Sequence, residues 1–175
     1  MPLLSARNIK RTYGYLKRNG LKAAIDAAME ETSAVIKEDY DYIPPSESEL
    51  TRQRELSAFK GGGLKFSIVV PAYNTDPGFF RELIVSCLDQ TYPYFELIIA
   101  DASTEDNVKN IVEGFTADPA TAQSAKRIKY FRLPENLGIS GNTNKAIERA
   151  KGDYIVFLDH DDLLTPDALY EVAAA

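Results

Sequence analysis

The chain has 175 residues, of which 45% are hydrophobic and 26% charged, a composition typical of a globular protein long enough to bury a core. No apolar run approaches the roughly 18 residues of a membrane-spanning helix, and Arg7, Lys10 and Arg11 interrupt the region where a signal peptide would be apolar. The single cysteine, Cys87, excludes a framework of internal disulfides. We therefore expect a cytoplasmic protein.

The net charge of −6 is unevenly distributed along the chain. Residues 1–25 contain six basic side chains and no acidic one, whereas the remaining 150 residues carry 14 bases against 26 acids. An acidic domain is a poor surface for nucleic acid, so we expect no nucleic-acid partner. If such a domain binds phosphate groups, it needs a metal ion or backbone amides to do so.

The first part of the chain has the pattern of a helical hairpin. Ile9, Tyr13 and Leu16 recur at helical spacing opposite a basic side, and a second helical stripe covers residues 21–36. Three interpretations of these basic helices stay open. They could make peripheral contact with the inner face of an anionic membrane, they could dock against a partner, or they could pack against the same protein with their basic side in solvent.

A domain boundary is expected after this region. Residues 47–60 have the polar composition of a helical connector, and Gly61-Gly62-Gly63 follows as a flexible linker. We therefore divide the chain into an N-terminal helical region with its linker at 1–60 and a second domain at 64–175.

Beyond the linker, apolar runs alternate with amphipathic helices at the spacing of right-handed βαβ units. This order predicts an α/β fold with a mostly parallel, Rossmann-like sheet. Asp76-Pro77 and Thr165-Pro166 each place a capping side chain before a proline at the first helical position. Strands are expected at 66–70, 95–100, 128–132 and 154–158, and helices at 77–89, 107–115, 140–150 and from Thr165 onward.

The last predicted strand ends in a group of carboxylates. Ile155 to Leu158 are apolar without interruption, which predicts a strand buried on both faces, and Asp159, Asp161 and Asp162 follow it directly. These carboxylates would repel one another unless a cation or hydrogen-bond donors offset their charge, and their oxygens suit Mg²⁺ or Mn²⁺. The residues alone also allow a solvated acidic turn that caps the following helix.

Two other strand ends meet the same edge of a parallel sheet. The first is followed by Tyr73, whose ring either stacks on a nucleobase or packs at the strand end, and a Gly-rich dinucleotide turn is absent there. The second ends at Asp101, which could accept a hydrogen bond from a base or a ribose or could cap the next helix. Ser103 or Thr104 already supplies such a cap, which favours a free carboxylate at Asp101.

The third strand is followed by a loop that is rich in small and polar residues. Gly138, Ser140, Gly141 and Asn142 stand around the start of the predicted helix and offer exposed amides and short donors. Such a loop can hold a phosphate group at a helix N-terminus, although similar loops are also common as plain structure.

Five motifs in this order resemble the N-terminal, nucleotide-binding half of a family 2 glycosyltransferase of the GT-A fold. The resemblance covers about residues 65–175 and leaves residues 1–60 outside it. The Asp-His-Asp-Asp sequence and the residues after it are similar to bacterial enzymes that build surface polysaccharides, often rhamnose-containing ones. The motifs are Ser67-Ile-Val-Val-Pro-Ala-Tyr-Asn74, Leu88-Asp-Gln-Thr-Tyr-Pro93, Glu96-Leu-Ile-Ile-Ala-Asp-Ala-Ser-Thr104, Glu135-Asn-Leu-Gly-Ile-Ser-Gly-Asn-Thr-Asn144 and Gly152-Asp-Tyr-Ile-Val-Phe-Leu-Asp-His-Asp-Asp162.

The resemblance implies transfer of a sugar from a nucleoside-diphosphate donor of the UDP or dTDP type to a glycan acceptor in one inverting step. It implies a nucleobase pocket lined by Pro71, Ala72 and Tyr73, with Asn74 beside them in the nucleotide-sugar site.

The resemblance also assigns roles to three aspartates. Asp101 would bind the base. Asp159 would lie towards the ribose and phosphates, and Asp159 and Asp161 would bind Mn²⁺ or Mg²⁺ on the diphosphate.

Two departures limit what the resemblance implies. Where family members often have Ala-Arg-Asn, this chain has Asn142-Thr143-Asn144, so a role of that arginine does not transfer. The resemblance also gives the role of general base to no residue of this chain, Asp162 included.

Three alternative functions stay open from the residues. A non-catalytic module that binds nucleotide or metal has the same motifs. A nucleotidyltransferase is less consistent with a first strand that lacks a Gly-rich, Lys-bearing phosphate loop. A metal-dependent phosphatase would need its nucleophilic aspartate where Tyr73 and Asn74 stand.

Overall fold

The computed structural model describes residues 43–56 and 63–175. The chain divides into two compact units, Met1–Ile43 and Pro44–Ala175. The helical hairpin predicted within residues 1–36, with its membrane contact, lies outside the described residues and stays a prediction. So does the boundary at the glycine linker, of which Gly61 and Gly62 are not described. Among the described residues, no helix is both long and apolar enough to cross a membrane.

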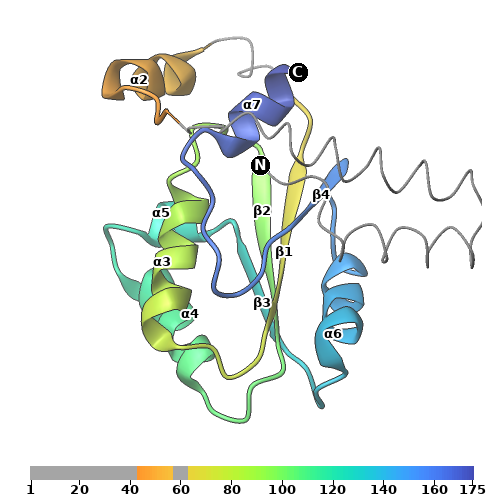
Figure 1. The fold of residues 1–175 in the computed structure, drawn as a ribbon. Helices are drawn as coiled ribbons and strands as arrows, with labels where there is room; N and C mark the ends of the chain where they lie inside the picture. Colours follow the sequence, from red (N-terminus) through yellow and green to blue (C-terminus); the bar gives the residue numbers. More distant parts are fainter. Residues whose placement is uncertain (1–42, 57–62) are drawn as a thin grey trace, which may run out of the picture. The chain divides into compact units, whose positions relative to one another are not determined.

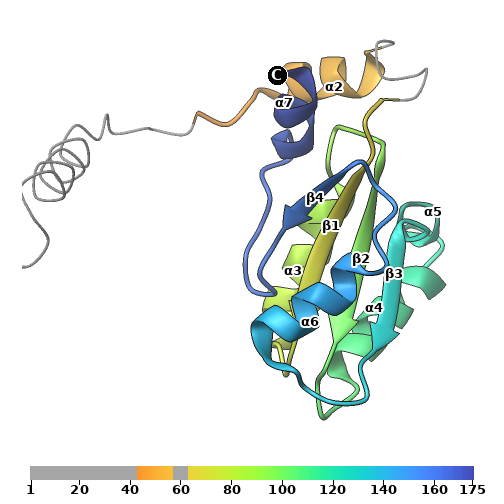
Figure 2. The same ribbon diagram turned by 90° about the vertical axis from the view of Figure 1, so that its right-hand side faces the viewer.

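The second unit is built on a four-stranded parallel sheet of order β3-β2-β1-β4, which confirms the predicted α/β class (Figure 1). Helices α3 and α4 lie on one face of the sheet and α6 on the other (Figures 1 and 2). The strands are β1 (Phe66–Ala72), β2 (Phe95–Asp101), β3 (Ile128–Arg132) and β4 (Tyr154–Phe157). The helices are α2 (Glu47–Glu55), α3 (Pro77–Leu88), α4 (Asn107–Ala117), α5 (Ala122–Ala125), α6 (Gly138–Ile147) and α7 (Ala168–Ala174).

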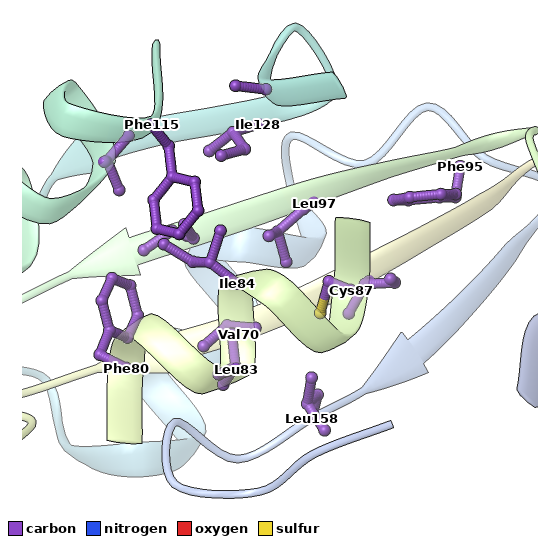
Figure 3. Close-up of a cluster of buried hydrophobic side chains, with 14 of the residues drawn as sticks. Val70, Phe80, Leu83, Ile84, Cys87, Phe95, Leu97, Phe115, Ile128 and Leu158 are labelled. Carbon is purple, nitrogen blue, oxygen red and sulfur yellow. The ribbon is translucent and has the colours of Figure 1, made fainter. Parts of the chain in front are cut away.

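Strands β1 and β2 form the centre of the sheet and are buried along their whole length. Their side chains alternate between two clusters, as the pleat of a strand requires. Val70 and Leu97 pack with Leu83 and Ile84 of α3 in the larger cluster (Figure 3). The smaller cluster, on the α6 face, contains Val69, Ile98, Ala100, Ala102, Leu133 and Ala146. Two apolar faces explain why both strands read as continuous apolar runs.

Cys87 belongs to the larger cluster, as its place on the apolar side of α3 predicts. Burial raises the pKa of its thiol to about 12. The thiol is therefore protonated near neutral pH and serves as a small core side chain.

One prediction about the last strand, β4, is wrong. β4 lies at the edge of the described sheet, and Phe157 is 65% exposed, so the burial on both faces that was expected of Ile155 to Leu158 is wrong at this residue. Its pairing with β1 stops early: Leu158 N donates to Val69 O at 3.2 Å. The next group of β1 that faces β4 belongs to Pro71, which has no N–H to donate. The chain therefore leaves the sheet at the aspartates.

The start of β4 is held at the opposite end of the sheet by a buried carboxylate. Glu96 accepts hydrogen bonds from Ser67 Oγ at 2.8 Å and from Lys151 N at 2.7 Å, and Lys65 Nζ lies 3.1 Å away. Gly152 then passes so close to β1 that a Cβ atom would lie 2.7 Å from Lys65 O and from Ser67 N. This close approach brings β4 into register beside β1.

The sequence predicts the start of α3 correctly and the start of α7 incorrectly. Asp76 accepts from the amides of Gly78 and Phe79, with Pro77 at the first helical position, as predicted. The cap predicted at Thr165 is wrong, because α7 begins only at Ala168.

The backbone before α7 is instead bound to the end of α3. Gln90 Nε2 donates to Thr165 O at 2.6 Å, and Thr91 N donates to Pro166 O at 2.8 Å. These tertiary bonds hold the segment in a non-helical turn.

Helix α2 confirms the helical part of the predicted connector, although it ends at Glu55 rather than near residue 60. Ser46 caps its start by accepting from Glu49 N at 3.2 Å. The helix is polar apart from the buried Leu50, and its buried Gln53 accepts a hydrogen bond from Thr91 Oγ1 at 2.8 Å.

Candidate functional site

The loops that follow β1, β2 and β3 all lie at one end of the sheet, the lower end in Figures 1 and 2. The loop after β4 runs towards the same end and turns back to α7. Parallel pairing of all four strands causes this convergence, because their carboxyl ends share one edge. The residues predicted to bind a nucleotide and a metal are thus brought to one edge, and their contacts decide what each can do.

At the end of β1, the four predicted residues divide into two pairs. Pro71 and Ala72 are buried in the sheet, and Ala72 O accepts a hydrogen bond from Ala102 N at 2.9 Å. Tyr73 and Asn74 are exposed, and Tyr73 keeps 42% of its surface open to solvent. Only the second pair therefore presents exposed side chains at this edge.

Asn74 fastens the loop after β1 to the loop after β2. Its backbone amide donates to Ser103 Oγ at 2.9 Å, and its Oδ1 accepts from Thr104 N at 2.9 Å and from Thr104 Oγ1 at 3.1 Å. Its φ is +48°, a left-handed conformation that asparagine tolerates better than most residues. These bonds fix the backbone directly after Tyr73. They also correct the prediction that Ser103 or Thr104 caps the next helix, because α4 begins only at Asn107.

Asp101 is not the free carboxylate that the sequence predicts. Its side chain is 0% exposed, and Oδ1 accepts from Ser103 N at 2.8 Å. Oδ2 accepts from Tyr130 Oη at 2.8 Å and from Arg132 Nη1 at 3.2 Å. Burial raises the pKa of Tyr130 to about 12, so its hydroxyl is protonated near neutral pH and donates to the carboxylate.

Sequence reasoning missed Tyr130 and Arg132, although a signal for both exists. They stand two residues apart on β3 and so share one face of that strand. In the register of the sheet, Arg132 lies opposite Asp101. A basic side chain at the end of one strand and an acidic one at the end of its neighbour suggest such a pair once the strand order is known.

In the loop before α6, two backbone amides already donate hydrogen bonds to nearby asparagine side chains. Asn136 Oδ1 accepts from Gly138 N and from Asn142 Nδ2, both at 2.9 Å, and Asn142 Oδ1 accepts from Leu137 N at 3.0 Å. Gly138 has a φ of +75°, and α6 begins there, two residues before the predicted start. Asn142 is buried and internally bonded, so it is not the exposed donor that the sequence predicts. Gly138 and Ser140 are exposed at the first turn of α6.

The three aspartates after β4 are exposed. Asp162 N donates to Asp159 O at 3.2 Å, which closes a turn around His160 and Asp161. The Nδ1 atom of His160 is buried and lacks a hydrogen-bond partner among the described residues. Within residues 43–56 and 63–175, no three His, Cys, Asp or Glu side chains stand close enough together to hold a metal ion. The aspartates are therefore accessible but are not arranged as a closed protein cage.

A small polar cavity lies beside the fastened loops. Its volume is about 260 Å³, below the range of roughly 300–1,000 Å³ typical of ligand pockets. It does not include Tyr73, Asp101 or the aspartates after β4, so it is not an enclosed site for a whole nucleotide sugar. It is lined by Asn74, Thr75, Ser103, Glu105, Asn107 and Val108.

Comparison with known proteins identifies the family to which this chain belongs. The family model for glycosyl transferase family 2 matches residues 67–175, which is more than half of the chain. The chain therefore belongs to glycosyl transferase family 2.

Several relatives carry the name of a glycosyltransferase. The poly(ribitol-phosphate) β-N-acetylglucosaminyltransferase TarS of Staphylococcus aureus is 31% identical over 114 residues, which cover 63% of this chain and 18% of TarS. A β-1,3-glucosyltransferase of Campylobacter jejuni that acts on GalNAc(5)-diNAcBac-PP-undecaprenol is 34% identical over 107 residues, or 60% of this chain and 32% of that protein. The chain spans only 12% to 38% of the first curated relatives that it matches.

Solved structures agree with the fold. A crystal structure of TarS in complex with UDP-GlcNAc superposes with a TM-score of 0.55 at 30% identity, covering 63% of this chain and 30% of TarS. A mannosyltransferase from Pyrobaculum calidifontis has a TM-score of 0.52 at 19% identity, over 73% of this chain and 37% of that one. The second likeness shows a shared fold alone.

Proposed function

We propose that residues 64–175 form the donor-binding part of a glycosyltransferase that takes a nucleoside-diphosphate sugar of the UDP or dTDP type. The observation that supports this most is the gathering, at one sheet edge, of the exposed residues Tyr73, Asp159 and Asp161. The TarS structures, 30% identical to this chain, contain UDP-GlcNAc or UDP, which supports a donor of the UDP type.

In this proposal, the nucleoside lies against the ends of β1 and β2. The base stacks on Tyr73, a contact worth roughly 1–3 kcal/mol per base in other proteins. Asn74 fixes the backbone next to Tyr73 through its bonds to Ser103 and Thr104. Pro71 and Ala72 contribute through the packed end of β1 rather than through exposed side chains.

Asp159 and Asp161 would hold Mn²⁺ or Mg²⁺, with Asp159 also towards the ribose and phosphates. Their exposed carboxylates fit such a cation, because Mg²⁺ that is shared with a diphosphate takes only one or two carboxylates from the protein. When bound, the cation offsets the negative charge that grows on the leaving diphosphate.

The reaction in this proposal is inverting transfer to a glycan acceptor, as in bacterial surface-polysaccharide synthesis. Neither the resemblance nor the described geometry assigns the general base to a residue of this chain. A non-catalytic nucleotide-binding module would bind the same ligands. Turnover of a nucleotide sugar by the full-length protein distinguishes the enzyme from such a module.

Calorimetric titration of the 175-residue chain with UDP tests the binding site. We expect tighter binding with Mn²⁺ than with a chelator, and equal affinity in both conditions would remove the metal from the proposal. Tyr73→Ala should weaken UDP binding by roughly fivefold to a hundredfold, since one base stack is worth about 1–3 kcal/mol. Tyr154→Ala removes another exposed tyrosine, on β4, and serves as the matched control. If the wild-type chain bound neither UDP nor dTDP, the proposed function would be wrong.

A further inference from the structure

Helix α2 lies outside the residues that the family model matches, yet a buried hydrogen bond joins it to them. The matched residues begin at 67, and α2 ends at Glu55. Thr91 Oγ1 donates to Gln53 Oε1 at 2.8 Å, and both residues are only 3% exposed. Breaking a buried polar pair is costly, because water cannot easily replace the lost partner. The bond therefore connects α2 to the turn after α3.

Thr91 also holds the chain that follows the aspartates. Residues 159–162 are called the aspartate turn below. The backbone amide of Thr91 donates to Pro166 O at 2.8 Å, and Asp161 stands five residues before Pro166. Close by, Leu164 N donates to Ser86 Oγ of α3 at 3.3 Å. Thr91 thus links α2, through its hydroxyl, with the chain after the aspartate turn, through its amide.

A second contact joins α2 to α7. The hydrogen bonds and charge of Glu49 and, to a smaller extent, Tyr170 raise the pKa of the Arg52 guanidinium. Tyr170 belongs to α7, so the two helices interact directly. Because Arg52 is exposed, this contact contributes little to stability. The buried Gln53 is therefore the polar group of α2 that can hold the neighbouring chain in place.

The aspartate turn lies between two attachment points. At the first, Leu158 N donates to Val69 O at 3.2 Å, where the chain leaves β4. At the second, the chain is bound to Thr91. Within the turn, Asp162 N donates to Asp159 O at 3.2 Å, and the aspartates are exposed. Their placement beside a shared diphosphate therefore depends on how firmly the two attachment points are held.

We propose that Gln53 is a positioning residue for the aspartate turn, so that α2 contributes to the donor site. Gln53 acts through Thr91: it fixes the side chain of Thr91, whose amide fixes Pro166. The inference rests on the proposed function, because it requires a nucleotide and a cation at this edge. A loosened turn adopts the cation-binding arrangement for a smaller fraction of the time, and the apparent affinity falls by that fraction.

Calorimetric titration of the 175-residue chain with UDP tests this assignment. The quantity to measure is the metal factor, the ratio of the UDP affinity in Mn²⁺ to the UDP affinity in a chelator. Gln53→Met removes the acceptor and keeps the length of the side chain, and Thr91→Val removes the hydroxyl and keeps the shape. Each should lower the metal factor by roughly twofold to tenfold, the range for one lost hydrogen bond. Unchanged metal factors in both variants would overturn the inference.

Matched variants separate positioning from a general structural effect. Thr91→Ser keeps the hydroxyl and should retain the wild-type metal factor. Thr51→Val removes a hydroxyl that donates to Glu47 O within α2, and it should also retain the metal factor. Uridine has no phosphate to share a cation, so Gln53→Met and Thr91→Val should bind it as wild type does. Equal losses of uridine and UDP affinity would indicate a general structural effect and would overturn the inference.

Hydrogen exchange of backbone amides provides a readout that needs no ligand. In Gln53→Met, the amides of Thr91 and Leu164 should exchange faster than in wild type, whereas the amides of β2 should keep their protection. Unchanged exchange at Thr91 and Leu164 would show that Gln53 does not hold this part of the chain, and the inference would be wrong.

The double variant Gln53→Met/Thr91→Val keeps the test decisive if a single variant fails to fold. Both partners of the bond are then apolar, so neither is left buried and unpaired. The variant still lacks the bond, so its metal factor should be lower than that of wild type, and a wild-type value would overturn the inference. Failure of the wild-type chain to bind UDP in either condition would instead overturn the proposed function.

Discussion

Gln90 and Thr165 are joined by a hydrogen bond of 2.6 Å from Nε2 to the carbonyl oxygen. Gln90 Oε1 also accepts from Leu169 N at 3.0 Å. One buried amide thus binds the end of α3 to the chain on both sides of the turn before α7. Because the aspartates lie between Leu158 and this anchor, Gln90 fixes one end of the segment proposed to bind the metal.

Gln90→Ala should destabilise the protein by about 1–3 kcal/mol, because the buried amide of Leu169 loses its partner. Urea denaturation measures this change in the free energy of unfolding. Gln90→Glu should also destabilise, since a carboxylate cannot donate to Thr165 O. The control is Gln123→Ala, an exposed residue of α5 whose loss should change stability by less than about 0.5 kcal/mol. A stable Gln90→Ala variant would mean that this anchor is not required.

Two glycines should respond in opposite directions to the same substitution. A Cβ at Gly152 would lie 2.7 Å from backbone atoms of β1, so Gly152→Ala should destabilise by about 1–3 kcal/mol through overpacking. Gly114 lies inside α4, where a Cβ would meet nothing within 4 Å. Gly114→Ala should therefore stabilise by about 0.5–1 kcal/mol. Melting temperatures of the two variants would show this opposite response, and a shift of the same sign in both would contradict it.

The sequence predicts the sheet well where both faces of a strand are apolar. β1 and β2 are continuous apolar runs, and both lie at the centre of the sheet. β4 has the same apolar pattern, but it lies at the edge of the described sheet. An apolar run alone does not show whether a strand has a neighbour on each side. The start of α7 was also mispredicted, since the bond from Gln90 to Thr165 outweighs a local capping signal.

The candidate site was predicted less completely than the fold. Parallel strand ends place Tyr73, Asp101 and the aspartates at one edge, and this much follows from the strand order. The bonds that close Asp101 depend on Tyr130 and Arg132, 29 and 31 residues away in the chain. Spacing within one strand cannot give the register between two strands. A buried carboxylate therefore looked free in the sequence.

The buried Glu96 should make the stability of the protein depend on acid. Burial alone would raise the pKa of Glu96, but hydrogen bonds from Ser67, from the amide of Lys151 and from Lys65 hold the pKa below its ordinary value of 4.5. A carboxyl whose pKa is lowered by folding stabilises the native state above that ordinary value. This stabilisation is lost as the pH falls through the lower pKa of the folded state.

Denaturation of wild type and Glu96→Gln between pH 7 and pH 3 checks this dependence. We expect Glu96→Gln to be less stable at pH 7, and the difference from wild type to shrink below pH 4.5. Ser67→Ala removes one of the bonds that lower the pKa, so its acid-dependent loss of stability should be smaller than in wild type and should be complete at a higher pH. A constant difference between wild type and Glu96→Gln across this range would mean that the carboxylate is not the acid-sensitive group.

The metal role can be tested on a single carboxylate after β4. Asp161→Asn keeps the size of the side chain and removes its charge, so the affinity for UDP in Mn²⁺ should fall to the value that wild type has with a chelator. Uridine has no phosphate to share a cation, so its affinity should not change. Asp162→Asn is the matched control, because this neighbouring aspartate is equally exposed and has no assigned role. If both variants lost the Mn²⁺ effect equally, the aspartates would act through their summed charge rather than through a ligand at Asp161.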